Sequence, residues 1–321
     1  MLAIVAPGQG AQAQGFLTPW LEVPKVRDQL EWLSSAAGMD LVHYGTVADD
    51  DTIRDTAVAQ PLLVAAGLVA AKALFPEPQQ AFQAIGVGAG HSVGEITIAA
   101  ATGVLTAEQA MMLVRERGRS MAEASAATPT SMTAVIGGKP DEVLAALDKH
   151  GLTPANNNGA GQVVAAGTVE QLEALKADPP HRARLIPLSV AGAFHTHHMA
   201  PAAEHLAELA RSVAANDPQV KLLSNADGAV VTSGQEVLDR LVGQVANPVR
   251  WDLCMATMAE LGVTGLLELP PSGTLFGIAK RNLKGVESFA LKTPDQLDDA
   301  MSFIAEHGSD DAGSDNSEVT R

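Results

Sequence analysis

Short apolar runs alternate with longer alanine-rich stretches along most of this chain. Leu2–Ala6 and residues 263–269 are runs of strand-forming side chains, whereas residues 58–74 and 107–124 repeat apolar positions at helical spacing. Strands that alternate with helices predict an α/β fold, in which helices cover a sheet. The other elements predicted in this part of the chain are strands at 84–89, 220–224 and 287–291, helices at 93–101, 201–215, 236–245, 253–261 and 274–283, and a last helix that ends near residue 305.

The pattern changes between residues 128 and 190. The elements predicted there are a strand at 132–136, a helix at Pro140–Lys149, strands at Thr153–Asn157 and 162–166, a helix at Val169–Ala177 and a strand at 184–189. This βαββαβ order predicts a small ferredoxin-like subdomain, inserted into a large α/β-hydrolase-like domain made of residues 1–127 and 191–305. Residues 306–321 are acidic and rich in Ser, Gly and Asn, which predicts a disordered tail.

Composition narrows the classes of function. Of the 321 residues, 46% are hydrophobic, which is enough for a large core. The formal net charge of −16 argues against binding to nucleic acid or to an anionic membrane surface. The chain has one cysteine, no basic segment before its first apolar run and no apolar run of about 18 residues. We therefore expect a cytoplasmic enzyme without disulfides, signal peptide or membrane span.

One serine lies in a motif that is typical of nucleophiles. Residues 90–94, with the sequence GHSVG, match G-x-S-x-G and place Ser92 between a predicted strand and a predicted helix. The glycines on either side let the strand and the helix approach closely around a sharp turn. Free N–H groups at the start of the helix favour a developing oxyanion. The alternative is a glycine-rich turn that merely contains a serine, and the strand–helix context argues against it.

A serine nucleophile needs a base, and three of the nine histidines lie together at His195, His197 and His198. They follow the last predicted strand of the small subdomain, where a loop between the two domains would project a base. A metal site is the alternative, because His195-x-His197 resembles the first ligands of some metal hydrolases. The next carboxylate is Glu204, on a predicted helix, so we expect no metal. Spacing alone does not decide which histidine is the base.

One arginine falls on the apolar face of a predicted helix. In residues 107–124 an apolar stripe runs through Leu113, Val114 and Met121, and Arg117 lies within it. Burying a guanidinium costs free energy unless an anion pairs with it. Two interpretations stay open: a buried salt bridge to a distant Asp or Glu, or a clamp for the carboxylate of a substrate.

The first strand is followed by the sequence GQGAQA at residues 8–13, which formally fits a dinucleotide-binding fingerprint. That fingerprint also requires an immediate helix and a second strand that ends in an acidic residue, and neither is predicted. The two glycines can instead bring the backbone N–H of Gln9 close to Ser92. Cys254 lies at helical spacing with other apolar residues of the helix at 253–261 and is predicted to be a core thiol.

Taken together, these motifs resemble one family. The segments that carry the likeness are residues 8–12 (GQGAQ), residues 90–95 (GHSVGE), Arg117, residues 161–164 (GQVV), residues 192–195 (GAFH) and residues 247–251 (NPVRW). In type and order they are similar to malonyl-CoA:acyl carrier protein transacylases, most closely to the stand-alone enzymes of type II fatty acid synthesis in actinobacteria, over roughly residues 1–300. Two positions depart from the usual pattern: Ala11 replaces a common Ser, and Val93 replaces a common Leu.

The resemblance implies a role for each matching residue. Ser92 would be the acylated nucleophile, His195 would be its base, and Gln244 would orient the histidine through a backbone carbonyl. The N–H groups of Gln9 and Val93 would form the oxyanion hole. The substrate contacts implied are Arg117 for the malonyl carboxylate, Met121 and Phe194 for the acyl pocket, and Asn156 and Asn158 for the side that faces coenzyme A and the carrier. Phe at position 194 resembles malonyl-selective members of the family.

The implied reaction is a ping-pong transfer of the malonyl group from malonyl-CoA to the phosphopantetheine thiol of acyl carrier protein, through malonyl-Ser92. It would supply fatty acid or polyketide synthesis, and the coenzyme A thioester is a substrate, so no cofactor is expected. A serine hydrolase or thioesterase is the main alternative. Such hydrolases usually carry their histidine late in the chain, whereas the best cluster here lies in mid-chain. A second alternative is a carrier-docking module without activity.

Acyl carrier proteins are acidic, and so is this chain, so docking requires a local basic patch. Lys280, Arg281 and Lys284, at the end of a predicted helix, are the candidates. The alternative is that these three are a solvated helix end, where cations are favoured by the helix dipole. We expect the chain to act as a monomer.

Overall fold

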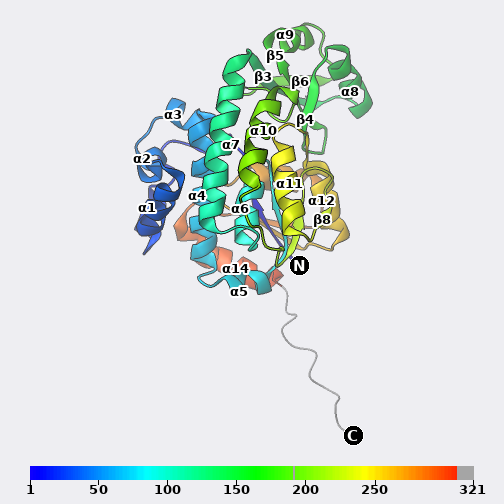
Figure 1. Ribbon diagram of the computed structural model, residues 1–321. Helices are drawn as coiled ribbons and strands as arrows, with labels where there is room; N and C mark the ends of the chain where they lie inside the picture. Colours follow the sequence, from blue (N-terminus) through cyan, green and yellow to red (C-terminus); the bar gives the residue numbers. More distant parts are fainter. Residues whose placement is uncertain (191, 309–321) are drawn as a thin grey trace.

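Two sheets organise the protein, and a computed structural model describes residues 1–190 and 192–308 of it (Figure 1). The larger sheet has the strand order β11-β10-β1-β2-β7-β8. Its strands are β1 (Leu2–Ala6), β2 (Ile85–Gly90), β7 (Lys221–Leu223), β8 (Val230–Val231), β10 (Gly265–Glu268) and β11 (Glu287–Ala290). All neighbours in this sheet are parallel except β8, which runs antiparallel to β7. The chain is therefore a mixed α/β protein, as its alternating pattern predicted.

β1 is buried along its whole length because both faces of the large sheet are covered. Leu2 and Ile4 belong to one apolar cluster, whereas Ala3 and Val5 belong to another. Side chains of a strand alternate between its two faces, so the continuous apolar run of β1 supplies both clusters at once. Such two-sided burial is typical of parallel sheets.

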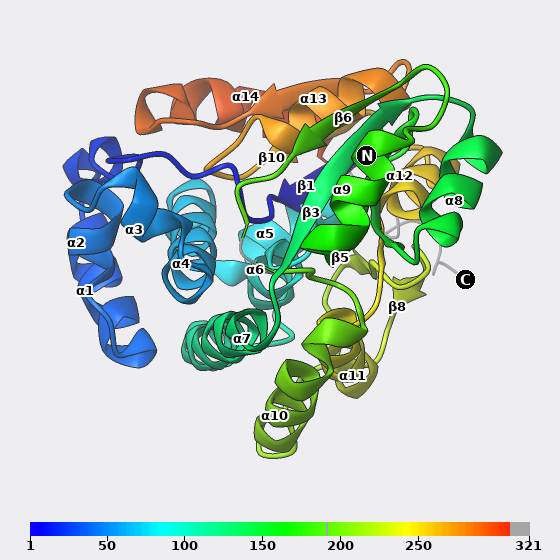
Figure 2. The same cartoon turned by 90° about the horizontal axis from the view of Figure 1, so that it is seen from above.

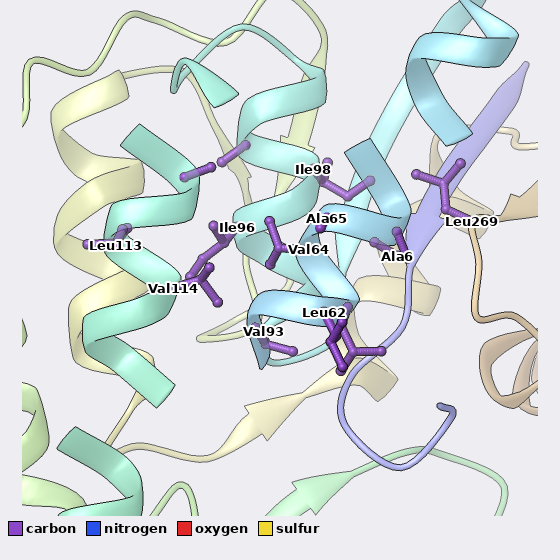
Figure 3. Packing of buried hydrophobic residues seen from close by; sticks show 14 of the residues in the cluster. Ala6, Leu62, Val64, Ala65, Val93, Ile96, Ile98, Leu113, Val114 and Leu269 are labelled. Carbon is purple, nitrogen blue, oxygen red and sulfur yellow. The ribbon is translucent and has the colours of Figure 1, made fainter. Parts of the chain in front are cut away.

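The helices form layers on this sheet. Those packed in the first cluster are α4 (Thr56–Leu74), α6 (Gly94–Ala101), α7 (Ala107–Ala127) and α14 (Leu297–His307), and those of the second are α12 (Trp251–Glu260) and α13 (Thr274–Asn282). Figure 2 shows β1 between α13 and α6. In Figure 3, Val64 of α4, Ile96 of α6 and Val114 of α7 lie between their helices and hold the three together.

Further helices complete the larger part of the molecule. They are α1 (Val26–Ala37), α2 (Leu41–Thr46), α3 (Asp50–Arg54), α5 (Pro78–Ala84), α10 (Ala200–Ala210), α11 (Gly234–Gln244) and the short 3-10 helices η1 (Pro19–Glu22), η2 (His197–Met199) and η3 (Pro294–Gln296). In Figure 1, α7, α10 and α11 lie side by side, and α1, α2 and α3 form one end of the molecule.

The smaller sheet has the strand order β6-β3-β5-β4-β9. Its elements are β3 (Thr130–Gly137), α8 (Pro140–Lys149), β4 (Thr153–Asn157), β5 (Gln162–Thr168), α9 (Val169–Ala177), β6 (Ala183–Pro187) and β9 (Val249–Arg250). The βαββαβ order predicted for this segment is present, and its four strands pair antiparallel. β9 was not predicted. It pairs parallel with β4 and joins the small sheet to the larger part of the chain.

Within residues 1–190 and 192–308, one helix, α4, is long and apolar enough to cross a membrane. Of its most apolar window, 67% is buried inside the protein. Its neighbours include α6 and α7, and polar Gln60 lies buried in its second turn. α4 therefore has the environment of a core helix.

Several element boundaries differ from the predicted ones. α4 begins at Thr56 rather than 58, because the Asp55 side chain accepts a hydrogen bond from the Ala57 N–H and caps the helix. α10 ends at Ala210 rather than 215, because the chain turns away and the Asn216 N–H donates to the Val104 carbonyl. The helices α2, α3 and α5 and the two-residue strand β8 were not predicted, since short elements carry little periodicity.

The predicted start of the tail is wrong by two residues. α14 continues to His307, whose ring is buried and packs tilted against Phe303 with 4.5 Å between ring centroids, and whose Nδ1 lies 3.1 Å from Thr264 Oγ1. Acidic composition marked the segment as a tail, but the apolar stripe of α14 extends through it. Residues 309–321 of the predicted disordered tail lie outside the described residues.

Candidate active site

Ser92 lies on a sharp turn between β2 and α6. Its φ of 53° is in the left-handed region, which is strained for a residue with a side chain. A Cβ at Gly90 would lie 2.0 Å from the carbonyl carbon of Gly94, and one at Gly94 would lie 2.2 Å from the Ala6 oxygen. No larger residue fits at either position. The strand–turn–helix context predicted for the serine is therefore confirmed.

His195 lies beside Ser92, and its other ring nitrogen is hydrogen-bonded to the backbone of Gln244. Ser92 Oγ is 2.8 Å from His195 Nε2, and His195 Nδ1 is 2.8 Å from the backbone oxygen of Gln244. A carbonyl oxygen can only accept, so Nδ1–H donates to it and Nε2 is left to accept the Ser92 hydroxyl proton. Burial and then the charge of Arg117 lower the pKa of His195 to about 3, which keeps the imidazole neutral and able to act as a base.

The other histidines of the cluster are placed differently. His197 and His198 lie in η2 with their ring centroids 4.1 Å apart. Both ring nitrogens of His195 are already hydrogen-bonded to Ser92 and Gln244, which leaves neither as a ligand for the metal site considered above. Geometry thus selects His195 as the partner of Ser92, a choice that spacing left open.

Among the described residues, one group of three could supply ligands to a metal ion: Glu287, Glu306 and His307. His307 bonds to Thr264, just before β10 begins, whereas Ser92 follows the carboxyl end of β2. In a sheet whose strands run parallel, these are opposite ends. This group is therefore separate from the Ser92 site.

Arg117 is buried on α7 and points at Ser92. One of its terminal nitrogens donates to Gln60 Oε1 at 2.6 Å, and the other donates to Gln244 Oε1 at 2.8 Å and to Ser92 Oγ at 3.3 Å. The ion pairs found in the described part of the chain do not include Arg117, so the interpretation as a buried salt bridge is wrong. Burial lowers the pKa of Arg117 to about 10, which leaves it cationic at neutral pH. A cation held only by neutral acceptors remains available to a substrate anion.

Glu95 and Asn225 support the site and were missed as functional residues. Glu95, buried in the first turn of α6, accepts a hydrogen bond from the Asn225 N–H at 2.6 Å and another from the Gln244 side-chain amide. The Asn225 side chain accepts from the Ser92 N–H and donates to the Gly90 oxygen, each at 2.8 Å. Burial raises the pKa of Glu95 to about 8, and the two donors and the Arg117 charge act in the opposite direction. Glu95 ends the GHSVGE segment, but no sequence signal identifies Asn225.

The loop after β1 passes beside the nucleophile. A Cβ at Gly8 would lie 3.0 Å from the His91 oxygen and 3.6 Å from Ser92 Cβ, so the chain entering Gln9 is close to the turn. Val93 caps α6. The oxyanion hole expected from the N–H groups of Gln9 and Val93 stays a prediction. The first helical segment after β1 is η1, so the helix that a dinucleotide fingerprint requires is absent from residues 7–18, and that interpretation is wrong.

Residues expected around the substrate lie near the same turn. Met121 is buried on α7, and its sulfur accepts from Gln60, the residue that also binds Arg117. Phe194, directly before His195, is buried as well. Asn158 Oδ1 accepts from His91 Nε2 at 3.0 Å, which ties the small sheet to the turn. Asn156 is buried on β4 next to β9. Their roles toward substrate stay predictions.

The remaining candidates make no hydrogen bond to Ser92 Oγ within the described residues. Cys254 is buried on α12 and donates to the Ser224 oxygen at 3.4 Å, and burial raises the pKa of its thiol, as a core thiol requires. Lys280, Arg281 and Lys284 are exposed at the end of α13. Lys280 lies 4.1 Å above the Phe276 ring, and Arg281 donates to Gln162 of the small sheet at 3.0 Å. These contacts do not distinguish a docking patch from a solvated helix end.

The fold and the site define a class of protein: an α/β enzyme with a serine–histidine pair on a strand–helix turn and a buried arginine beside the serine. Residues 4–300 match the family model described as acyl transferase domain. The malonyl CoA-acyl carrier protein transacylase of Mycobacterium tuberculosis is 51% identical over 299 residues, which cover 93% of this chain and 99% of that protein. This chain belongs to the acyl transferase family, among the malonyl CoA-acyl carrier protein transacylases.

Solved structures agree with this placement. The crystal structure of MCAT from Mycobacterium tuberculosis matches with a TM-score of 0.90 at 50% sequence identity, over 94% of this chain and 99% of that one. A type II PKS acyl-carrier protein in complex with its malonyl-transacylase matches with a TM-score of 0.85 at 31% identity, over 94% and 99% of the two chains. The family resemblance expected from the motifs is confirmed.

Proposed function

We propose that this chain transfers the malonyl group from malonyl-CoA to the phosphopantetheine thiol of an acyl carrier protein, through a malonyl-Ser92 intermediate. The observation that carries the proposal is a guanidinium beside a serine–histidine pair: an Arg117 nitrogen lies 3.3 Å from Ser92 Oγ, which is 2.8 Å from His195 Nε2. An acyl group with a free carboxylate at its far end suits that arrangement. The names of the relatives support the same activity.

In the first half-reaction, His195 Nε2 takes the Ser92 proton as Oγ attacks the thioester carbonyl. The N–H groups of Gln9 and Val93 stabilise the tetrahedral oxyanion. The carbon–sulfur bond then breaks, and His195 returns the proton to the thiol of coenzyme A. In the second half-reaction, the carrier thiol gives its proton to His195 and attacks malonyl-Ser92. The ester bond breaks, and Ser92 recovers its proton.

Arg117 gives the reaction its selectivity in this scheme. Its two donors to Gln60 and Gln244 hold the guanidinium plane, so a malonyl carboxylate that binds it is fixed with the thioester carbon near Ser92 Oγ. Met121 and Phe194 bound the space for the acyl group. An acetyl group lacks the carboxylate and gains nothing from the guanidinium.

We also propose how the two sheets divide the work. The order β6-β3-β5-β4 with antiparallel neighbours supports a ferredoxin-like subdomain, and the serine turn supports an α/β-hydrolase-like arrangement around β2. Asn156 and Asn158 lie on the coenzyme A side. Lys280, Arg281 and Lys284 form the carrier-facing patch, which lies where α13 contacts the small sheet through Arg281.

A labelling experiment tests the proposed function. The chain is incubated with malonyl-CoA labelled in the malonyl group, and holo-carrier protein is then added. We expect a malonyl ester on Ser92 whose label moves to the carrier thiol, and no ester in Ser92→Ala, whereas Ser302→Ala, at an exposed serine of α14, behaves as wild type. Label released to water rather than to the carrier indicates a hydrolase. Absence of any ester in the wild type indicates a docking module.

A further inference from the structure

We propose that Glu95 is a positioning residue for malonyl selectivity, an inference that rests on the proposed function. Its carboxylate turns the side-chain amide of Gln244 so that the amide oxygen faces Arg117. The guanidinium is thereby aimed at Ser92 without a direct anionic partner. The reaction scheme assigns Glu95 no role, and its hydrogen bonds go to Asn225 and Gln244 rather than to Ser92 Oγ or His195.

The argument begins with the two ends of one amide. Gln244 Nε2 donates to Glu95 and to the Ser92 backbone oxygen at 3.0 Å, while Gln244 Oε1 accepts from Arg117 at 2.8 Å. Turning the amide over would place its NH₂ group against the guanidinium and its oxygen against the carboxylate. Both contacts would be repulsive, because an amide has one donor end and one acceptor end. The carboxylate, together with the Ser92 backbone oxygen and Asn225 Oδ1 at 3.2 Å from Gln244 Nε2, therefore selects the orientation that Arg117 needs.

The second oxygen of Glu95 holds the nucleophile turn. It accepts the Asn225 N–H at 2.6 Å, and the Asn225 side chain in turn binds the Ser92 N–H and the Gly90 oxygen. One buried carboxylate is thus connected both to the turn that carries Ser92 and to the amide that holds Arg117. The backbone oxygen of the same Gln244 accepts from His195.

Distance between the two charges matters here. A carboxylate in direct contact with Arg117 would compete with the malonyl carboxylate for the guanidinium, whereas a buried cation with no anion nearby would be strongly destabilised. In its ionised form, Glu95 compensates the charge of Arg117 through Gln244 and leaves the face toward Ser92 open. This relay, Glu95–Gln244–Arg117, keeps the cation charged and available.

Glu95→Gln tests the relay with little change of shape. Both partners of Glu95 are N–H donors, and a glutamine offers only one acceptor oxygen, so its NH₂ must face one of the two donors. Transfer is measured with malonyl-CoA and with acetyl-CoA at pH 8.5, which lies above the raised pKa of Glu95, so that most of this carboxyl group is ionised in the wild type. We expect the malonyl-to-acetyl ratio of kcat/KM to fall about tenfold, because Arg117 is no longer held in place.

Glu268→Gln is the matched control. Glu268 is also a buried carboxylate that accepts backbone N–H groups, from Gly273, Leu275 and Phe276, but these belong to the start of α13. We expect E268Q to lower the unfolding midpoint and leave the malonyl-to-acetyl ratio within about twofold of wild type. A ratio that falls equally in both variants, or in neither, overturns the positioning role.

Glu95→Asp covers the case in which E95Q does not fold. It keeps two acceptor oxygens but shortens the side chain by one methylene, and we expect a fall of about threefold in the ratio. An unchanged ratio in E95D overturns the proposal, because the relay depends on reach. Failure of the proposed function looks different: the wild type itself then forms no malonyl-Ser92.

Discussion

The buried side chains around Ser92 are largely polar or charged, whereas those in the core of the small sheet are apolar. Around Ser92, the charged and polar side chains of Glu95, Arg117 and His195 are buried, and each is hydrogen-bonded to Gln244. Under α8 and α9, the buried cluster is apolar, with Leu147 and Leu175 at its centre. Burying polar groups costs desolvation free energy, and their hydrogen bonds form in only one geometry. Apolar packing stabilises the fold and depends little on the direction of contacts. The first region is organised for chemistry, and the second for stability.

Left-handed backbone conformations occur in both regions, but at different kinds of position. Ser92 and His195 both have φ near 60°, in the left-handed region, and they face each other across the site. In the small subdomain, positive φ values fall in turns, most of them at glycines such as Gly159, which adopt them without strain, and also at Ala160 and Arg182. Strain at the two reacting side chains is compensated by the network that holds them.

Removing the cation from the Ser92 region is expected to have the largest effect on activity. In Arg117→Ala, the oxygens of Gln60 and Gln244 lose their donor and the malonyl carboxylate loses its partner. We expect kcat/KM for malonyl-CoA to fall by about 10²–10³-fold and that for acetyl-CoA by less than about tenfold. Steady-state transfer to carrier protein with each thioester measures both.

Arg115→Ala is the control for that variant. Arg115 lies on the same helix, but it is exposed and its partner is the neighbouring Glu116. Exposed ion pairs contribute little, so both rates should stay within about twofold of wild type. Equal losses for malonyl and acetyl transfer in Arg117→Ala would show that the guanidinium does not recognise the carboxylate.

These two regions also differ in how far the sequence predicts them. The small sheet follows from local pattern: its strands and helices have strong periodicity and clear turns, so the βαββαβ order was predicted with most bounds within two residues. β9 could not be predicted, because two residues carry no periodicity and their pairing with β4 is set by tertiary contact.

In the Ser92 region, the sequence pattern predicted where functional residues lie but not which side chains they bond to. Arg117 was placed on the inner face of α7 by helical spacing alone, and the GHSVG segment placed Ser92 on its turn. The partners of Arg117, and the Glu95 behind one of them, could not be predicted, since Gln60, Gln244 and Glu95 come from three distant segments. Asn225 was missed for the same reason. Long-range hydrogen bonds leave no period in the sequence.

The pH dependence of the transfer rate tests whether His195 is a buried, neutral base. The pKa of this imidazole is lowered from 6.5 to about 3, first by burial and then by the Arg117 charge, so the base stays unprotonated as the pH falls from 7 to 5. We expect kcat/KM for acetyl-CoA, whose transfer does not use the Glu95 relay, to change less than about twofold over that range, where an ordinary histidine would lose about 25-fold. Measured with acetyl-CoA in Arg117→Ala, the acid limb should move to higher pH. A wild-type limb near pH 6.5 would contradict the buried, neutral base.

The smallest expected effect on rate comes from the apolar core of the small sheet. Leu147 is buried on α8, and Leu147→Ala should lower the free energy of unfolding by about 2–5 kcal/mol, because it leaves a cavity. Its contacts do not reach Ser92, so kcat should stay within about twofold of wild type.

Ile96→Ala removes a side chain of similar burial from α6, between α4 and α7 (Figure 3). It should cost comparable stability and also lower kcat about tenfold, because α6 carries the Ser92 turn. Denaturant unfolding and steady-state transfer on the same two proteins decide the matter: equal losses of kcat would mean that the two regions are not mechanically separate.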